Sequence, residues 1–354
     1  MNRCLGLIAL LSAACSGATP HTRPKLPDGG AVCDYVAPDA RACCNGGSGC
    51  AGGLWCNTNS CACEDVVTPC ANTGHPPPAG DAGTPDPGNV PAGSIGLDGG
   101  SVDKLWFATT GDTRPGSCDA TDQYPKETFA RIAQSMKALK VQFALDLGDH
   151  MFVCNGSVPE AQQQMGYYMA GVAQGPSPFF MTMGNHECGS YSCLPGSTDA
   201  NFTTYLVALN RHLPWYSFDV HTAQGLARFV IIADDSWGAE QSAWLESTLA
   251  DADRKARYTI VSRHHPVTGS RSGNPELVAT IERHRYSLIL TAHDHSYSHG
   301  TDHGGRAAII GIGGAGSNAP GFGTILQGDD GKLNFVLRDA NGNPTGTPWS
   351  VPPQ

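Results

Sequence analysis

Five short apolar runs in this 354-residue chain each end in side chains that bind divalent metal ions. A single Gly-Asp or His-x-His is usually a turn or a surface feature, but five such endings in succession, all drawn from Asp, Asn and His, point to one site. A carboxylate can bridge two cations about 3.5 to 4 Å apart, while imidazoles and an amide oxygen complete their shells. A water between such ions becomes hydroxide near neutral pH and can attack a phosphate ester in line. The endings are Gly111-Asp112, Gly148-Asp149, Gly184-Asn185-His186-Glu187, His264-His265-Pro266 and Ala292-His293-Asp294-His295.

Each ending lies just past the carboxyl end of a predicted strand, which is where open α/β sheets assemble their sites. The alternation of short apolar runs with helical patterns predicts an α/β domain. Helices are expected near 126–139, 240–250 and 274–284. Strands are expected at 105–110, 141–147, 179–183, 228–233, 258–262, 287–291, 307–312 and 333–337.

The composition indicates a folded domain with tethers attached to it. Gly (44) and Pro (25) together make up about a fifth of the residues, whereas hydrophobic residues, at 40%, suffice for one well-packed domain. A wholly disordered chain is excluded. The formal net charge of -10 gives no basic field for nucleic acid, so an anionic substrate must be held by local chemistry.

The N-terminus has the features of an export signal. Arg3 precedes the apolar run 5–11, which is too short to span a bilayer, and Ser12-Ala13-Ala14-Cys15 follows. This pattern resembles the signal and lipobox of bacterial lipoproteins, which implies removal of residues 1–14 and a lipid anchor at Cys15. Because Ser12 stands where a branched aliphatic residue is preferred, cleavage by an ordinary signal peptidase is the alternative. The expected location is the outer membrane or cell surface, otherwise the periplasm or the medium.

The rest of the chain divides into four predicted segments. Residues 15–32 are a polar tether, and residues 33–70 carry eight cysteines among Gly and Asn. This even number predicts a four-bridge disulfide module whose pairing the spacing leaves open, with a zinc site as the alternative. Residues 71–103 are a Pro/Gly-rich linker, and residues 104–345 are the catalytic domain.

At its metal-binding motifs the sequence resembles the calcineurin-like metallophosphoesterases, and among them the purple and tartrate-resistant acid phosphatases. The resemblance covers about residues 105–316 and implies a four-layer αββα sandwich, in which two sheets are flanked by helices. The similar segments are Leu145-Asp146-Leu147-Gly148-Asp149, Gln241-Ser242-Ala243-Trp244-Leu245, Val261-Ser262-Arg263-His264-His265-Pro266-Val267 and His293-Asp294-His295.

The resemblance also assigns roles to individual residues. It implies that two divalent ions, Fe, Mn or Zn, are bound and that Asp149 bridges them. His186 is expected to bind the phosphate or protonate the leaving oxygen, with Glu187 orienting it behind. Asn185, His264 and His293 are expected to hold one ion, and Asp112 and His295 the other.

Two departures from the family pattern leave the second ion a ligand short. Arg114 stands two places after Asp112, where many members carry a ligand His, and Phe152 stands where purple phosphatases place a Tyr. A phenyl ring cannot replace a phenolate, so no coloured ferric centre is expected. His150 or Thr113 could fill the gap, although neither is preferred.

Several polar residues near the motifs have two interpretations. Arg114 either reaches a phosphate oxygen in a bidentate manner or is a solvated loop residue, and the same choice applies to Arg263 and His265. His299 and His303 either line the cleft or are plain surface residues.

Two further features have a structural interpretation. Gly311-Ile312-Gly313-Gly314-Ala315-Gly316 satisfies a dinucleotide fingerprint, but no helix follows, so a tight turn is expected. Four cysteines lie in loops after the metal motifs and could stiffen the rim of the site. The pairs Cys188–Cys193 and Cys118–Cys154 are expected, with other pairings open.

The sequence therefore predicts an exported phosphomonoesterase that acts on a small phosphate ester through two metal ions and a bridging hydroxide. A phosphodiesterase of the same fold is the first alternative, since the same ions can serve either reaction. The second is a surface-binding lipoprotein with a weakened catalytic domain. The sequence gives no indication of the oligomeric state.

Overall fold

A computed structural model of the chain describes residues 90–189, 192–267, 273–301, 307–309 and 320–354, together with two short strands before them. These two, β1 (Trp55–Asn57) and β2 (Ala62–Glu64), pair antiparallel within the predicted Cys-rich segment. The predicted signal peptide, Cys15, the Gly311–Gly316 motif and His303 lie outside the described residues. Within the described part of the chain, no helix is long and apolar enough to cross a membrane.

Two large sheets form the centre of the described domain. As far as the chain is described, the first has eight strands, in the order β12 (His299–Thr301), β13 (Ala307–Ile309), β11 (Leu288–Leu290), β10 (Tyr258–Ser262), β9 (Gly225–Ile231), β8 (Tyr216–Thr222), β4 (Gly99–Val102) and β3 (Gly93–Gly96). The second has six described strands, in the order β16 (Pro344–Val351), β15 (Leu333–Asp339), β14 (Gly321–Gln327), β5 (Trp106–Thr110), β6 (Phe143–Asp146) and β7 (Phe179–Met181).

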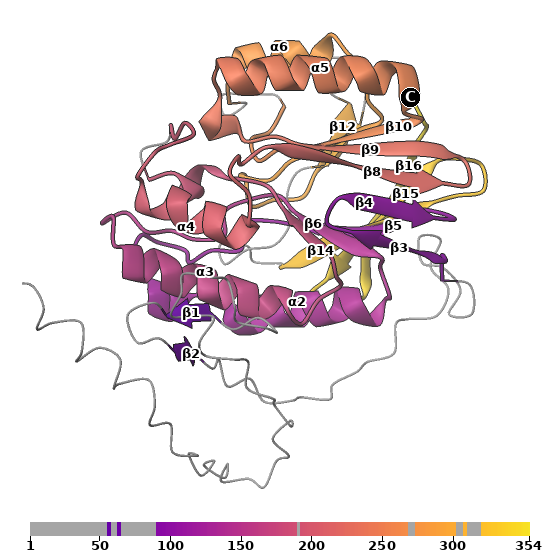
Figure 1. Ribbon diagram of the computed structural model, residues 1–354. Helices are drawn as coiled ribbons and strands as arrows, with labels where there is room; N and C mark the ends of the chain where they lie inside the picture. Colours follow the sequence, from indigo (N-terminus) through magenta and orange to yellow (C-terminus); the bar gives the residue numbers. More distant parts are fainter. Residues whose placement is uncertain are drawn as a thin grey trace, which may run out of the picture. The chain divides into compact units, whose positions relative to one another are not determined.

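Helices cover the outer faces of both sheets, which confirms the expected αββα sandwich (Figure 1). Leu245 and Leu277 pack on the outer face of the eight-stranded sheet. Ile132 and Met136 pack on the outer face of the six-stranded sheet, at Trp106. The helices are α2 (Lys126–Ala138), α3 (Val158–Val172), α4 (Ala200–Leu209), α5 (Ala239–Lys255) and α6 (Pro275–Glu282), and 3₁₀ turns lie at Thr121–Gln123, Asn185–Glu187 and Asp234–Ser236.

An aromatic cluster fills the space between the sheets. Phe143 of β6 stacks on Phe107 with ring centroids 5.1 Å apart, and it meets the edge of Phe229 from the other sheet at 5.3 Å. Phe218 stacks on Phe180 across the sheets at 3.8 Å. Strands that are covered on both faces have continuous apolar sequences. For this reason the central strands could be found from the sequence.

The described domain begins before the boundary placed at residue 104. Strands β3 and β4 lie in the segment that was predicted to be a linker. The prediction was wrong there because their sequences, GSIG and GGSV, contain few apolar residues. The glycines permit close pairing: a Cβ on Gly100 would lie 2.9 Å from the Cα of Ile95. Ile95 and Val102 pack against the inter-sheet core. At the other end, β16 runs to Val351, past the predicted boundary at 345.

Two helices and several strands were not expected from the sequence. Helix α3 has a polar composition, yet Gln164 is fully buried, donating to Thr121 Oγ1 at 2.8 Å and accepting from the Phe152 amide at 2.7 Å. Helix α4 is capped by Asp199, the residue before it, whose carboxylate accepts from two backbone amides of the first turn. Besides β1 to β4, the additional strands are β8, β12, β14 and β16.

Removing strands β3 and β4 is expected to destabilise the domain. The buried Val102 and the half-buried Ile95 would leave the inter-sheet core, and complete burial of an aliphatic side chain of this size contributes about 1.5 to 3 kcal/mol. A chain of residues 104–354 should therefore melt at least about 5 °C below a chain of residues 90–354, as measured by circular dichroism. Equal Tm values would show that the two strands contribute nothing to stability.

Candidate metal centre

The strand ends of both sheets bring the predicted site residues together. Strands β5, β6 and β7 are parallel in one sheet, and β9, β10 and β11 are parallel in the other. The loops that follow these strands carry every residue predicted to act in the site. From the six-stranded sheet come Asp112, Arg114, Asp149, Asn185, His186 and Glu187, and from the eight-stranded sheet come His264, His265, His293 and His295.

Four of the predicted ligands have left-handed backbone conformations. The φ angles are 54° at Asp112, 64° at Asp149, 76° at His293 and 52° at His295. Residues other than glycine adopt this region at a cost, and such strain clusters at functional sites where the surroundings enforce it. At Asp112 the enforcing contact is a hydrogen bond from its amide to the Gly148 carbonyl, at 2.9 Å.

Four donor atoms converge in what we call the Asn185 cluster: Asp149, Asn185, His264 and His293. Asn185 Oδ1 lies 2.9 Å from His293 Nδ1 and 3.1 Å from His264 Nε2, and these two nitrogens are 3.2 Å apart. Asp149 Oδ1 lies 3.4 Å from His264 Nε2. Ligands about 2.1 Å from one metal ion lie about 3.0 to 3.4 Å from one another, so these donors fit a single divalent ion.

The orientation of His264 supports a cation in this cluster. Its Nδ1 lies 2.8 Å from the Leu147 carbonyl, which only an N–H can satisfy, so in the neutral ring the Nε2 lone pair points at Asn185 Oδ1. Burial alone would lower the pKa of His264, but Asp149 and Asp112 outweigh it and raise the pKa to about 10. The cluster therefore attracts positive charge to this position, and a metal ion would supply it.

A second group of donors, the Asp112 cluster, consists of Asp112, Asp149 and His295. Their ligand atoms lie within 4.8 Å of one another. Burial, with Asp149 nearby, raises the pKa of Asp112 to about 7 against the opposing influence of His264. The Arg114 guanidinium lies among these donors, with Nε 3.1 Å from Asp149 Oδ2 and Nη2 3.1 Å from His295 Nε2.

His186 lies beside both clusters. Its Nε2 is 3.7 Å from Asp149 Oδ2, its backbone amide donates to Asp149 Oδ1 at 3.1 Å, and its ring contacts Phe152 with centroids 3.9 Å apart. The side chain is 12% exposed, so part of it is accessible to solvent. Burial lowers the pKa of His186 below its ordinary value, so the imidazole is neutral near pH 7.

Glu187 holds together the loops that carry the predicted ligands. Its carboxylate accepts from the backbone amides of Gly184 at 2.7 Å, Asp149 at 2.9 Å and His150 at 2.7 Å. The His150 ring is fully buried between Asp146 Oδ1, at 2.9 Å, and Glu187 Oε1, at 3.3 Å. His150 therefore faces away from both clusters and does not fill the missing ligand position.

Asp234 and Asp235, which were not predicted from the sequence, form a second supporting group with Arg263 and His265. Asp234 and Arg263 form a buried ion pair, and Asp234 Oδ2 also accepts from the His264 amide at 3.3 Å. His265 Nε2 lies 2.9 Å from Asp235 Oδ2. Arg263 thus positions the His264 loop. The available signal was that Asp234 and Asp235 end an apolar run, as the predicted ligands do.

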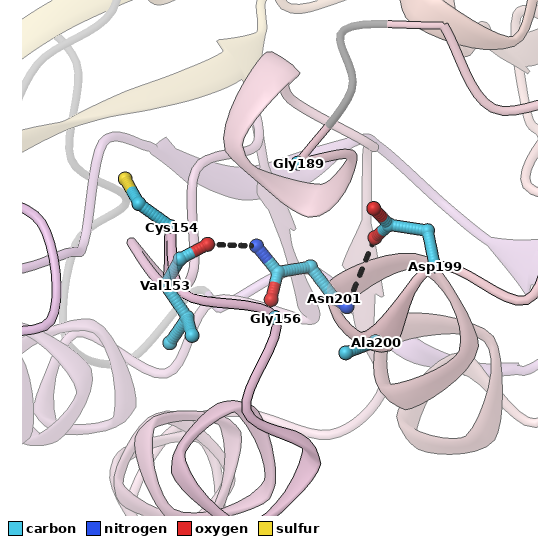
Figure 2. Close-up of a pocket in the computed structure, with 7 residues that line it drawn as sticks. All are labelled: Val153, Cys154, Gly156, Gly189, Asp199, Ala200 and Asn201. Carbon is cyan, nitrogen blue, oxygen red and sulfur yellow. Dashed lines mark hydrogen bonds between the residues drawn. The ribbon is translucent and has the colours of Figure 1, made fainter.

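Disulfides and a small cavity form the rim beside His186. The bonds Cys118–Cys154 and Cys188–Cys193 confirm the expected pairs. Asn201 lines a cavity of about 250 Å³ and donates to the Val153 carbonyl at 2.8 Å. Figure 2 shows this bond among the lining residues. The same side-chain nitrogen donates to the His186 carbonyl at 3.0 Å. His299, in contrast, is exposed and stacks on Trp349.

These features agree with a known family. Residues 105–297, more than half of the chain, match the calcineurin-like phosphoesterases, and the chain belongs to this family. Its structure is similar to a purple acid phosphatase from yellow lupin (Lupinus luteus) seeds, with a TM-score of 0.51 and 16% identity over 71% of this chain and 55% of that one. It is also similar to a dimetal phosphatase from Danio rerio, with a TM-score of 0.50 and 14% identity over 71% of this chain and 99% of that one.

These likenesses concern the fold, because the identities are low. The chain matches only about half the length of the lupin enzyme. No curated protein matches the sequence.

Substituting Gly184→Ala is expected to weaken metal binding. A Cβ at this position would lie 2.5 Å from the Asp149 amide nitrogen and would also meet Asp149 Oδ1, so the carboxylate must move. We expect a loss of at least about tenfold in affinity for Zn²⁺ or Mn²⁺, as seen when the surroundings of a ligand are altered. Gly116→Ala is the control, because nothing lies within 4 Å of its added Cβ. Equal affinities in the two variants would contradict this role.

Substituting Asp234→Asn is expected to lower stability by about 3 to 5 kcal/mol, because Arg263 would remain buried without its partner charge. Urea unfolding measures this change. Asp98→Asn, which removes a fully exposed partner of Arg211, should leave stability unchanged. A similar loss in both variants would show that burial of the pair is not the cause.

Proposed function

We propose that this chain is a metal-dependent phosphomonoesterase that acts outside the cytoplasm. The observation that supports this most is the convergence of the Asn185 cluster, drawn from both sheets, beside the partly exposed ring of His186. A divalent ion on these donors, Fe, Mn or Zn, would polarise a phosphoryl oxygen and supply an activated water. The family to which the chain belongs fits this chemistry.

His186 is the residue we assign to the phosphoryl group. It lies at the exposed side of the centre, and its amide and the Asn201 side chain fix its backbone. Because its pKa is lowered, the neutral ring donates an N–H to a phosphoryl oxygen near pH 7. Protonation of a leaving oxygen requires the imidazolium, so this contribution grows toward acid pH.

Monoesters are favoured over diesters by the charge of the centre. A monoester presents a dianionic phosphoryl group, and the guanidinium of Arg114 adds a permanent positive charge beside the Asn185 cluster. The two solved structures named above are phosphatases. The converged ligand set disfavours the weakened, surface-binding alternative.

Export is proposed from the N-terminal pattern and the disulfides. Disulfides persist in oxidising compartments, and the domain contains Cys118–Cys154 and Cys188–Cys193. With Cys15 as the acylated residue, the protein would be an outer-membrane or cell-surface lipoprotein. Without acylation it would be periplasmic or secreted.

Hydrolysis of a chromogenic monoester and a diester tests the proposed function. We expect faster turnover of the monoester, lost with a chelator and restored by Mn²⁺ or Zn²⁺. His186→Ala should lower kcat about 10²- to 10⁴-fold without changing the bound metal. His221→Ala is the control, because His221 is exposed at the opposite end of the β8–β9 hairpin from the strand ends that carry the ligands.

Three outcomes would contradict the proposal. Preference for the diester would favour a phosphodiesterase. No turnover of either ester with any divalent ion would favour the surface-binding alternative. Full activity of the His186→Ala protein would remove the role given to this residue.

A further inference from the structure

The guanidinium of Arg114 lies among the donors of the Asp112 cluster, and each of its three nitrogen atoms has a partner. Nε donates to Asp149 Oδ2 and Nη2 lies against His295 Nε2, both at 3.1 Å, while Nη1 donates to the Pro115 carbonyl at 2.9 Å. The side chain is only 13% exposed. These contacts fix the guanidinium in place and distinguish it from a solvated loop arginine.

Two of the three donors in the Asp112 cluster are occupied by these bonds. A guanidinium can only donate, so Asp149 Oδ2 and His295 Nε2 must accept, with the lone pairs that a metal ion would need. His295 must then be neutral.

The two positions that carry the missing metal ligands in family members are occupied here by Arg114 and Phe152, which pack against each other. Position 114 itself is the place of the ligand His in many family members, and position 152 is the place of the ligand Tyr in others. Here the Arg114 guanidinium packs over the Phe152 ring at 4.5 Å from its centroid. Neither side chain offers a lone pair to a metal ion.

Asp149 still lies between two cation positions. Its Oδ1 faces His264 and the Asn185 cluster, while its Oδ2 faces Arg114. Placing a divalent ion in the Asp112 cluster as well would set a second cation against the guanidinium, with strong repulsion at this separation in a buried site. With the guanidinium in this position, the donors fit one ion and one guanidinium rather than two ions.

We propose that Arg114 replaces the second metal ion, so that the centre holds one divalent ion in the Asn185 cluster and Asp149 bridges this ion to the guanidinium. This proposal rests on the proposed function only for the reaction that the site carries out, and not for the number of ions that it binds. It revises the expectation of two ions that the family resemblance gave. It also assigns Arg114 a charge that no chelator can remove.

Counting bound metal tests this assignment on the full chain. After loading with excess Mn²⁺ and removal of free ion, wild-type protein should retain one ion per chain by elemental analysis, and its electron paramagnetic resonance spectrum should be that of an isolated Mn²⁺. Arg114→His, which restores Asp-x-His at this position, should retain two ions per chain and give an exchange-coupled spectrum. Arg131→His is the control, because Arg131 is exposed on α2, and it should retain one ion.

The wild-type count alone decides the question. Two tightly bound ions with a coupled spectrum would overturn the assignment, whether or not the Arg114→His variant folds. One bound ion in a protein that hydrolyses neither ester would leave the assignment intact and refute the proposed function. Hydrolysis of the monoester by a protein that holds two ions would overturn the assignment and leave the proposed function intact.

Discussion

The centre is organised by one buried anion, the carboxylate of Asp149, whose side chain is 1% exposed. A buried carboxylate is tolerated only where cations and N–H donors compensate it. Burial alone would raise the pKa of Asp149, but His264, His186 and Arg114 hold it well below its usual range. Each of these groups comes from a different loop. The loops are therefore arranged so that positively charged groups reach the two carboxylate oxygens of Asp149.

This compensation requires both sheets to be in their correct relative positions. Asn185 follows a strand of the six-stranded sheet and His264 a strand of the eight-stranded one, yet their donor atoms are 3.1 Å apart. The distance is fixed by the packed rings between the sheets, such as Phe143 against Phe229. Protein interiors are close-packed and transmit small displacements, so core packing and ligand geometry are parts of one structure.

The central strands and the residues that converge beside them could be predicted from the sequence because both leave local signals, an apolar run and a metal-binding ending. It could not tell which way a polar side chain at such an ending points. His150 and Asp234 occupy endings like those of the ligands, yet both lie behind the site and support it. The position of the Arg114 guanidinium depends on contacts with loops that are distant in the sequence, such as the one that carries His295. Strands 93–96 and 99–102 were not predicted because their Gly-rich sequences contain no alternating or continuous apolar pattern.

The three hydrogen bonds that the Glu187 carboxylate accepts from backbone amides have an evolutionary consequence. One carboxylate satisfies three backbone amides from two loops and an imidazole behind them, so its replacement would leave four groups in need of new partners at once. Single substitutions at residues 150, 184 or 187 would each be costly, although a suitable combination could be neutral. Variation at these positions should therefore be epistatic, and the residues should change together or not at all among descendants of this sequence.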